Sequence, residues 1–198
     1  MLSALKISAL QDELTSLWHR QAAILPAGSE DEFLRVVSAQ HLANFELWHE
    51  EDKARTPGAS DHEVAEVKCS IDRINQRRND LVETCDSMLF EWLSSRGLPT
   101  PDAELHSETP GLIIDRLSIL SLKLFHTQEE IGRASGPPGH EQRNRERHRI
   151  LSDQQSDLVY CLDRLWQQVL AGQRRIKLYR QMKMYNDPTL NPVLYGRK

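Results

Sequence analysis

The sequence lacks the features that identify several large classes of protein. It has only three cysteines, and the odd number of Cys69, Cys85 and Cys161 argues against a disulfide framework, so we expect small buried thiols in a reducing compartment. No stretch approaches the roughly 20 apolar residues of a membrane span. The N-terminal segment has no basic region followed by a continuous apolar run. We therefore expect a cytoplasmic protein with no signal peptide and no membrane insertion.

Motifs for common catalytic loops and for nucleic-acid binding are also missing. There is no Gly-rich phosphate loop, no nucleophile elbow and no zinc motif. The net charge of -4 gives no reason to expect a nucleic acid as a partner. No segment of strand length alternates between apolar and polar residues. These absences leave a helical globular protein as the remaining class.

Apolar residues do recur with helical spacing along almost the whole chain. Ser29 and Ser60 each precede a glutamate by three residues, as in a capping box, and Thr109-Pro110 is a typical helix start. The pattern predicts five main helices, over residues 2–22, 29–55, 60–96, 112–131 and 142–171. The fourth is apolar nearly all round, so it should be the central helix.

The predicted fold class is all-α. We expect residues 1–198 to form a single-domain bundle of five to six helices with antiparallel neighbours. The breaker segment 134–142 should be a flexible loop. Gly172 should end or bend the fifth helix, a basic continuation that begins at Arg174 should follow it, and residues 186–198 should form an irregular C-terminal tail.

Two polar stripes stand out among the predicted helices. On the third helix, the stripe recurs at intervals of three, four, four and three and consists of Asp72, Asn75, Asn79, Glu83 and Asp86. On the second helix, a matching stripe with Glu51 on its flank consists of His41, Asn44, Trp48, Asp52 and Arg55. Antiparallel neighbours joined by a short turn should bring the two stripes to face each other.

Carboxylates at this spacing favour a hard divalent cation such as Mg²⁺, which prefers oxygen ligands. We expect Glu51, Glu83 and Asp86 to hold the metal, Asp52 to act as a base, and Asn79 to orient water. The residues of these two helices expected to bind a phosphorylated ligand are His41, Asn44, Arg55, Asn75 and Arg78. Arg78 falls on the apolar side of its helix, so it requires a partner.

The stripes have an alternative interpretation as buried polar networks that fix the register of the helices. In that case the protein would be a non-catalytic adaptor, and a homodimer formed through an apolar helix face is a further alternative. The basic residues Arg174, Lys177 and Arg180 either bind an anionic ligand or form a solvated helix end. Asp115, Ser118 and His126 share a face of the fourth helix and are weaker candidates.

Several segments resemble one bacterial family of small helical proteins of unknown function. They are NFELWHEEDKAR (44–55), IDRINQRRNDLVETCD (71–86), TPGLIIDRLSILSLKLFH (109–126) and YRQMKMYNDPTLNPVLY (179–195). The resemblance covers most of the chain and implies an all-α fold without an established activity. Members of that family are often encoded near lipopolysaccharide or other glycoconjugate genes.

A looser similarity links the chain to the all-α nucleotide pyrophosphohydrolases. It consists of Glu50-Glu51 on one helix and Glu83-x-x-Asp86 on the next, although the third glutamate of the first motif is replaced here. Those enzymes hold Mg²⁺ against a diphosphate with two acidic helices. This similarity implies a metal-dependent phosphoanhydride hydrolase that acts on a nucleotide or nucleotide-sugar.

Overall fold

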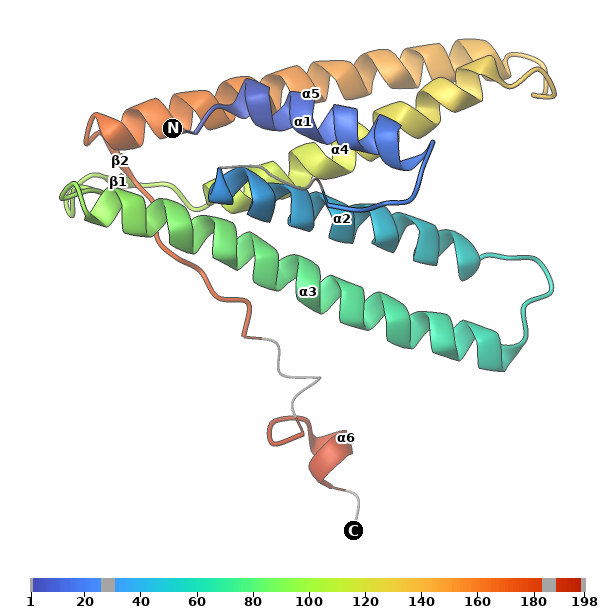
Figure 1. The fold of residues 1–198 in the computed structure, drawn as a ribbon, viewed down its shortest axis with the longest axis horizontal. Helices are drawn as coiled ribbons and strands as arrows, with labels where there is room; N and C mark the ends of the chain where they lie inside the picture. Colours follow the sequence, from blue (N-terminus) through green and yellow to red (C-terminus); the bar gives the residue numbers. More distant parts are fainter. Residues whose placement is uncertain (1, 26–30, 183–187, 197–198) are drawn as a thin grey trace.

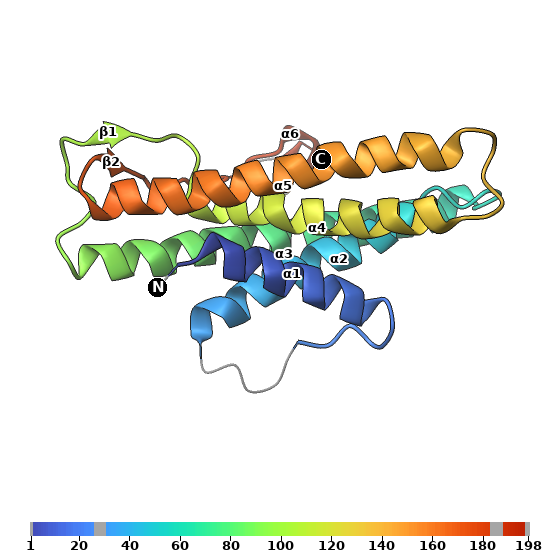
Figure 2. The same cartoon turned by 90° about the horizontal axis from the view of Figure 1, so that it is seen from above.

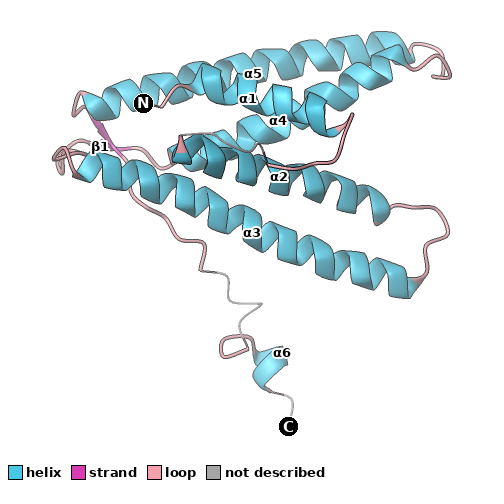
Figure 3. Ribbon diagram, in the orientation of Figure 1, coloured by secondary structure: helices cyan, strands magenta, loops and turns pink. Residues whose placement is uncertain are grey.

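Helices account for almost all of the regular structure in the computed structural model, which describes residues 2–25, 31–182 and 188–196. The all-α prediction is confirmed: Figure 3 shows helices nearly throughout, with one pair of very short strands. The elements in chain order are α1 (Ala4–Trp18), α2 (Glu32–Lys53), α3 (Asp61–Ser94), β1 (Glu104–Leu105), α4 (Pro110–Gly132), α5 (His140–Leu170), β2 (Arg174–Arg175) and the four-residue α6 (Pro192–Tyr195) (Figure 1).

Two antiparallel helix hairpins, α2–α3 and α4–α5, form most of the molecule, and α1 packs against α4 (Figures 1 and 2). Helix α4 contacts all four of the other long helices. Its side chains Ile113, Ile114, Leu117 and Leu122 are at most 2% exposed. The prediction that this helix is the central one is therefore confirmed.

Capping residues set where the helices begin. Ser60 caps α3 in a reciprocal capping box with Glu63, and Thr109 caps α4 with proline directly after it, as predicted. Helix α2 instead begins after Asp31, whose carboxylate accepts hydrogen bonds from the amides of Phe33 and Leu34. The expected cap Ser29 lies outside the described residues.

Helix α5 ends just before Gly172, as the sequence allowed, and the basic run beyond it is not helical. Gly172 has a φ of +69°, a left-handed conformation that ends the helix. The chain then turns back so that β2 pairs in parallel with β1, with Glu104 opposite Arg174. Ile176 follows this pair and is buried in the main core at 3% exposure. The burial of this side chain explains why the segment is extended and not a solvated helix end.

The cysteine prediction holds for one residue of three. Cys85 is buried, and burial raises the pKa of its thiol to about 12. Cys69 and Cys161 are exposed on the outer faces of α3 and α5, which corrects the expectation that all three are buried. Within the described ranges, none of the helices combines the length and apolarity needed to cross a membrane.

Candidate functional site

A cavity of about 410 Å³ lies among α2, α3 and α4. Helix α2 contributes most of its lining, and the central helix α4 closes one side with apolar side chains. The lining residues are Asn44, Leu47, Trp48, Glu51, Asp52, Arg55, Arg78, Ile119 and Leu122. We call this cavity the α2–α4 pocket. It gathers five residues of the predicted site: Asn44, Glu51, Asp52, Arg55 and Arg78.

A charged pair sits at the inner side of the α2–α4 pocket. Arg78 of α3 donates from Nε to Oδ1 of Asp115 at 2.8 Å and from Nη2 to Oδ2. The side chain of Asp115 is 8% exposed and that of Arg78 is 23% exposed. The hydrogen bonds and the charge of Asp115 raise the pKa of Arg78, so the guanidinium stays charged. The prediction that Arg78 requires a partner is confirmed.

Two amides complete the shell around Asp115. Its Oδ1 also accepts hydrogen bonds from Nδ2 of Asn44 at 2.9 Å and from Nε2 of Gln40. The same Asn44 nitrogen donates to Ser118 at 2.9 Å. Among the described residues, no donor reaches Oδ1 of Asn44 and no acceptor reaches Nη1 of Arg78. The pocket therefore contains one acceptor and one cationic donor that remain available to a ligand.

The outer part of the pocket carries charges of both signs. Arg55 donates to the Glu51 carboxylate at 2.7 Å and also to the Glu51 backbone oxygen. Asp52 is exposed, and no described residue bonds to its carboxylate. Exposed ion pairs contribute little to stability, so Glu51 and Arg55 can separate to meet a ligand at small cost.

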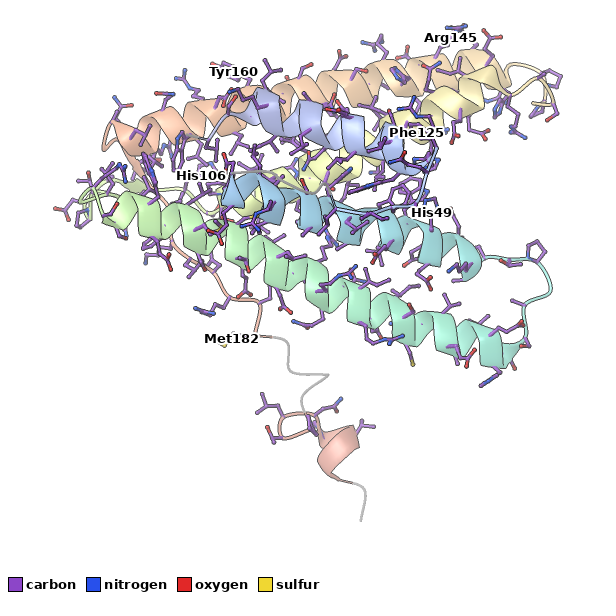
Figure 4. The ribbon with its side chains drawn as sticks, in the orientation of Figure 1. His49, His106, Phe125, Arg145, Tyr160 and Met182 are labelled. Atoms are coloured by element: carbon purple, nitrogen blue, oxygen red, sulfur yellow. The ribbon has the colours of Figure 1, made fainter. Side chains whose placement is uncertain are left out.

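An aromatic cluster supports the outer wall of the pocket. The Trp48 ring stacks on His126 of α4, with centroids 4.7 Å apart and planes 9° apart. His49 and Phe125, labelled in Figure 4, both contact the ring of His19 at the end of α1. Burial is the main cause of a lowered pKa for His49, and the charges of His19 and His126 lower it further. This packing holds the Trp48 ring in one orientation.

A buried polar network lies behind the pocket and contains His41. Its Nδ1 is 2.7 Å from Ser118 Oγ, and its Nε2 is 2.9 Å from Thr15 Oγ1. Thr15 is in turn 2.9 Å from Ser121. Burial lowers the pKa of His41 to about 3, so the imidazole is neutral and uses one donor and one acceptor. With no exposed surface, His41 positions Asn44 through Ser118 and does not touch the pocket.

The polar stripe of α3 does not face the α2–α4 pocket, which corrects the predicted meeting of two stripes. Asp72 pairs with Lys68 on its own helix, and Asn75 and Asn79 make no side-chain hydrogen bond to any described residue. Glu83 accepts a hydrogen bond from the backbone amide of Gln181 at 2.8 Å. The physical reason is the rotation of α3 about its axis, which is set by the packing of several helices together; it places Arg77 beside Glu46 of α2 and turns the stripe away from the pocket.

Asp86 binds the first residues of α4. Its carboxylate accepts hydrogen bonds from the Thr109 hydroxyl at 2.5 Å and the Gly111 amide at 2.7 Å. Burial raises its pKa to about 6, although those two hydrogen bonds act in the opposite direction. A carboxylate at a helix start is favoured by the free amides there. Asp86 therefore links α3 to α4 and is not available to a ligand.

The three predicted magnesium ligands lie apart in this fold. Glu51 is at the mouth of the pocket, Glu83 contacts the C-terminal segment, and Asp86 is buried at the start of α4. In the part of the chain that the structure describes, no three His, Cys, Asp or Glu side chains are grouped so that they could hold a metal ion. A metal at this site would need ligands from another source.

The basic C-terminal residues lie away from the pocket. Arg174 pairs with Glu104 across the short strands at 3.0 Å, and Arg180 lies 3.7 Å from Glu83. Lys177 is exposed. Two of the three predicted anion-binding residues are thus engaged in ion pairs that hold the C-terminal segment along the bundle.

Comparison with known proteins gives the family of the chain. Residues 34–178 match the model of a family described as a protein of unknown function, DUF4254. The chain belongs to this family. No curated protein and no solved structure matches it significantly. The matched range runs from α2 to just beyond β2, so it contains the whole α2–α4 pocket, whereas α1 precedes it.

Asp115 is the main residue whose role the sequence did not reveal. It shares a helix face with Ser118, but only the fold shows that it is the counter-ion of Arg78. A signal was present: Arg78 and Asp115 are charges of opposite sign, each within an otherwise apolar helix face. Because two unpaired buried charges are costly, such residues are expected to pair when their helices meet.

Proposed function

We propose that the α2–α4 pocket binds a phosphorylated small molecule, such as a nucleotide or nucleotide-sugar. The observation that carries this proposal is the presence of two arginines, Arg55 and Arg78, with the free Asn44 oxygen in one cavity. Arginine presents several donors in a fixed plane and suits phosphate oxygens. The apolar walls formed by Trp48 and Ile119 would contact the base or sugar portion.

A divalent cation would enter this pocket together with the ligand. Of the expected metal ligands only Glu51 lines the pocket, and one carboxylate alone holds Mg²⁺ weakly. Mg²⁺ commonly binds through one or two carboxylates and the phosphates of a substrate. We therefore expect Mg²⁺ and a diphosphate to bind cooperatively, with little binding of Mg²⁺ alone.

The reaction that suits this arrangement is hydrolysis of a phosphoanhydride. A water molecule would attack the terminal phosphorus, Asp52 would accept its proton, and the bond from phosphorus to the bridging oxygen would break. The leaving phosphate would take the electron pair of that bond, stabilised by Arg55 and Arg78. In this scheme Asp52 keeps its predicted role, while Asn79 has none.

Thermal unfolding tests the binding proposal. Wild-type protein is melted with Mg²⁺ alone, with pyrophosphate or a nucleoside diphosphate alone, and with each pair. Ligand and metal together, at about ten times their Kd, should raise Tm by about 3–5 °C, whereas Mg²⁺ alone should have little effect. Arg55→Gln should remove the shift because it removes a guanidinium that binds phosphate. The variant should still fold, because Arg55 is exposed and its loss spares the core. Arg35→Gln, which changes an exposed ion-paired arginine of α2, is the matched control.

An unchanged Tm with every diphosphate tested, with and without metal, would contradict the binding proposal. Hydrolysis is tested separately by release of inorganic phosphate from the ligands that bind. Asp52→Asn should abolish release while the Tm shift remains. If ligands bind and no phosphate is released by the wild type, the site binds without catalysing this reaction.

A second candidate function is a helical scaffold without a ligand. The observation that favours it is the network of Thr15, His41, Ser118 and Asn44, which consumes much of the polar stripe of α2 in internal hydrogen bonds. Such a network fixes the register of α1, α2 and α4. Under this alternative no diphosphate shifts Tm, and Arg55→Gln behaves like Arg35→Gln in every condition.

A further inference from the structure

A line of side-chain hydrogen bonds runs from the surface of α1 to the α2–α4 pocket. Its outer end is Asp12 of α1, an exposed residue that does not line the pocket. Nε2 of Gln155 on α5 donates to both oxygens of the Asp12 carboxylate, at 3.1 and 3.3 Å. The hydroxyl of Ser121 on α4 donates to the same carboxylate. Partial burial raises the pKa of Asp12, and these hydrogen bonds act in the opposite direction because they favour the charged form.

Four further hydrogen bonds connect Ser121 to Asn44 in the pocket. Ser121 Oγ lies 2.9 Å from Thr15 Oγ1, which lies 2.9 Å from Nε2 of His41. On the other side of the imidazole, Nδ1 lies 2.7 Å from Ser118 Oγ, and Asn44 Nδ2 donates to that oxygen at 2.9 Å. All five side chains are at most 3% exposed, so water competes little with their hydrogen bonds. Together with the carboxylate at the outer end, they form what we call the α1 relay.

The carboxylate fixes the direction of every hydrogen bond in the α1 relay. A hydroxyl has one hydrogen to donate, and an ionised carboxylate can only accept. Because Ser121 gives its hydrogen to the carboxylate, it accepts from Thr15, and Thr15 in turn accepts from His41. The proton of the neutral imidazole therefore lies on Nε2, and Nδ1 accepts from Ser118. With the proton on Nδ1 instead, the Ser118 hydroxyl would have no acceptor among the described residues.

The α1 relay also determines which end of the Asn44 amide faces the pocket. Since Ser118 donates to the imidazole, its oxygen accepts one hydrogen of Asn44 Nδ2, and Asp115 accepts the other at 2.9 Å. Both hydrogens of the amide are thus used inside the protein. The oxygen Oδ1 is left to the pocket, where it can only accept. A phosphate oxygen cannot bond to it, whereas a hydroxyl or an amino group of a ligand can.

We propose that Asp12 is a positioning residue for the α2–α4 pocket, which acts through the α1 relay to hold the Asn44 oxygen toward a hydroxyl or amino group of the phosphorylated ligand. The ligand part of this inference rests on the proposed function, whereas the relay is present without a ligand. The inference narrows the ligand class to phosphorylated compounds that carry such a donor. Nucleoside diphosphates carry one, and the fully ionised magnesium complex of pyrophosphate does not.

Imidazole nitrogen chemical shifts, measured by nuclear magnetic resonance on the ligand-free protein, test the direction of the relay. Wild-type His41 should carry its proton on Nε2. In Asp12→Ala the carboxylate is lost, so Ser121 no longer has to donate outward. The ratio of the Nε2–H to the Nδ1–H form should then fall by about three- to tenfold, which is the usual effect of one hydrogen bond. Ser121→Ala breaks the relay one residue further in and should have the same effect.

Two further variants separate the relay from a general change at the surface of α1. Glu13→Ala removes the neighbouring exposed carboxylate of the same helix and is the matched control. Gln155→Ala removes the other donor to Asp12 but leaves the carboxylate to accept from the relay. Both variants should keep the wild-type ratio of the two imidazole forms, because neither changes a member of the relay.

Isothermal titration calorimetry with Mg²⁺ present tests the consequence for the pocket. Asp12→Ala should bind adenosine diphosphate about three- to tenfold more weakly than Glu13→Ala does, because the Asn44 oxygen is no longer held toward the donor of the ligand. The two variants should bind pyrophosphate equally, since it offers that oxygen no hydrogen. A loss of stability alone would weaken both ligands by the same factor.

Several results would overturn the proposal. They are a wild-type His41 with its proton on Nδ1, equal ratios of the imidazole forms in Asp12→Ala and Glu13→Ala, and an Asp12→Ala variant that weakens both ligands equally or neither. If the wild type binds neither adenosine diphosphate nor pyrophosphate, the proposed function of the pocket fails. In that case the imidazole ratios alone decide whether Asp12 sets the orientation of Asn44.

Discussion

Arg78 and Asp115 show how a single pair of charges organises the α2–α4 pocket. Asp115 accepts four hydrogen bonds from three residues, Arg78, Asn44 and Gln40, so its charge is well compensated despite its burial. Loss of one member of such a pair leaves an unpaired buried charge, which typically costs about 3–5 kcal/mol. The same pair presents Arg78 Nη1 to the pocket. Stability and ligand recognition therefore depend on the same two residues.

Burial shifts the pKa values of two titratable residues in opposite directions. His41 has a pKa lowered to about 3, and Asp86 has a pKa raised to about 6. The displaced pKa of His41 contributes stability that is present above its ordinary pKa of 6.5 and is lost as pH falls. For Asp86 the folded state binds the proton more tightly than the unfolded state does. The contribution of this raised pKa to the free energy of unfolding is full below about pH 4 and is lost as pH rises through about 6.

Because the stabilising contribution of Asp86 falls as pH rises, the variant Asp86→Asn, which cannot titrate at this position, gives a test. Between pH 4.5 and 7.5, the free energy of unfolding of the wild type should fall relative to that of the variant by about 2–3 kcal/mol. Urea unfolding followed by circular dichroism at several pH values measures the difference. His41 contributes equally to both proteins and cancels. A difference that does not change with pH would show that Asp86 titrates near its ordinary pKa.

At the scale of elements, α3 connects three parts of the molecule by different faces. Arg78 reaches α4 at the pocket, Arg77 pairs with α2, and Asp86 bonds to the start of α4. The close approach of α3 and α4 requires a small residue at Gly111. A β-carbon at that position would lie 2.7 Å from the Val82 backbone oxygen and 2.8 Å from the Asp86 carboxylate.

Gly111→Ala should therefore destabilise the protein by about 1–3 kcal/mol, because neither a backbone oxygen nor a buried carboxylate can yield easily. Gly132→Ala on the same helix is the control, since an added β-carbon there meets nothing within 4 Å. It should be neutral or slightly stabilising. Equal stability of the two variants in urea unfolding would mean that α3 and α4 separate without cost.

At the scale of the whole molecule, the chain after α5 closes one end of the bundle. The β1–β2 pair is supported by a hydrogen bond from the His106 amide to the Arg175 oxygen at 2.9 Å and by one from Arg175 Nε to Ala103 at 2.8 Å. Ile176 then enters the core that contains residues of α1 to α5. This segment joins the loop before α4 to the end of α5.

A chain that ends at residue 173 should lose about 2–4 kcal/mol of stability, because it lacks the strand pair and the buried Ile176 side chain. A chain that ends at residue 178 keeps both and should unfold close to the full-length protein. Thermal and urea unfolding of the two truncated proteins measure the difference. Equal losses would show that the stabilising contacts lie beyond residue 178.

The sequence by itself determined the all-α fold, most helix boundaries and the central position of α4. These features depend on local periodicity and on capping residues such as Ser60 and Thr109, whose interactions lie within a few residues of each other. The sequence also predicted that Arg78 has a partner, because Arg78 lies on the apolar face of its helix and an unpaired buried charge is costly. The end of α5 was partly readable from Gly172.

Only the tertiary structure decided which polar residues meet. The rotation of α3 about its axis sends Asp86 to α4 and Glu83 to the C-terminal segment, and it leaves Arg78 as the one α3 residue in the pocket. That rotation is set by the packing of several helices together, which no local pattern contains.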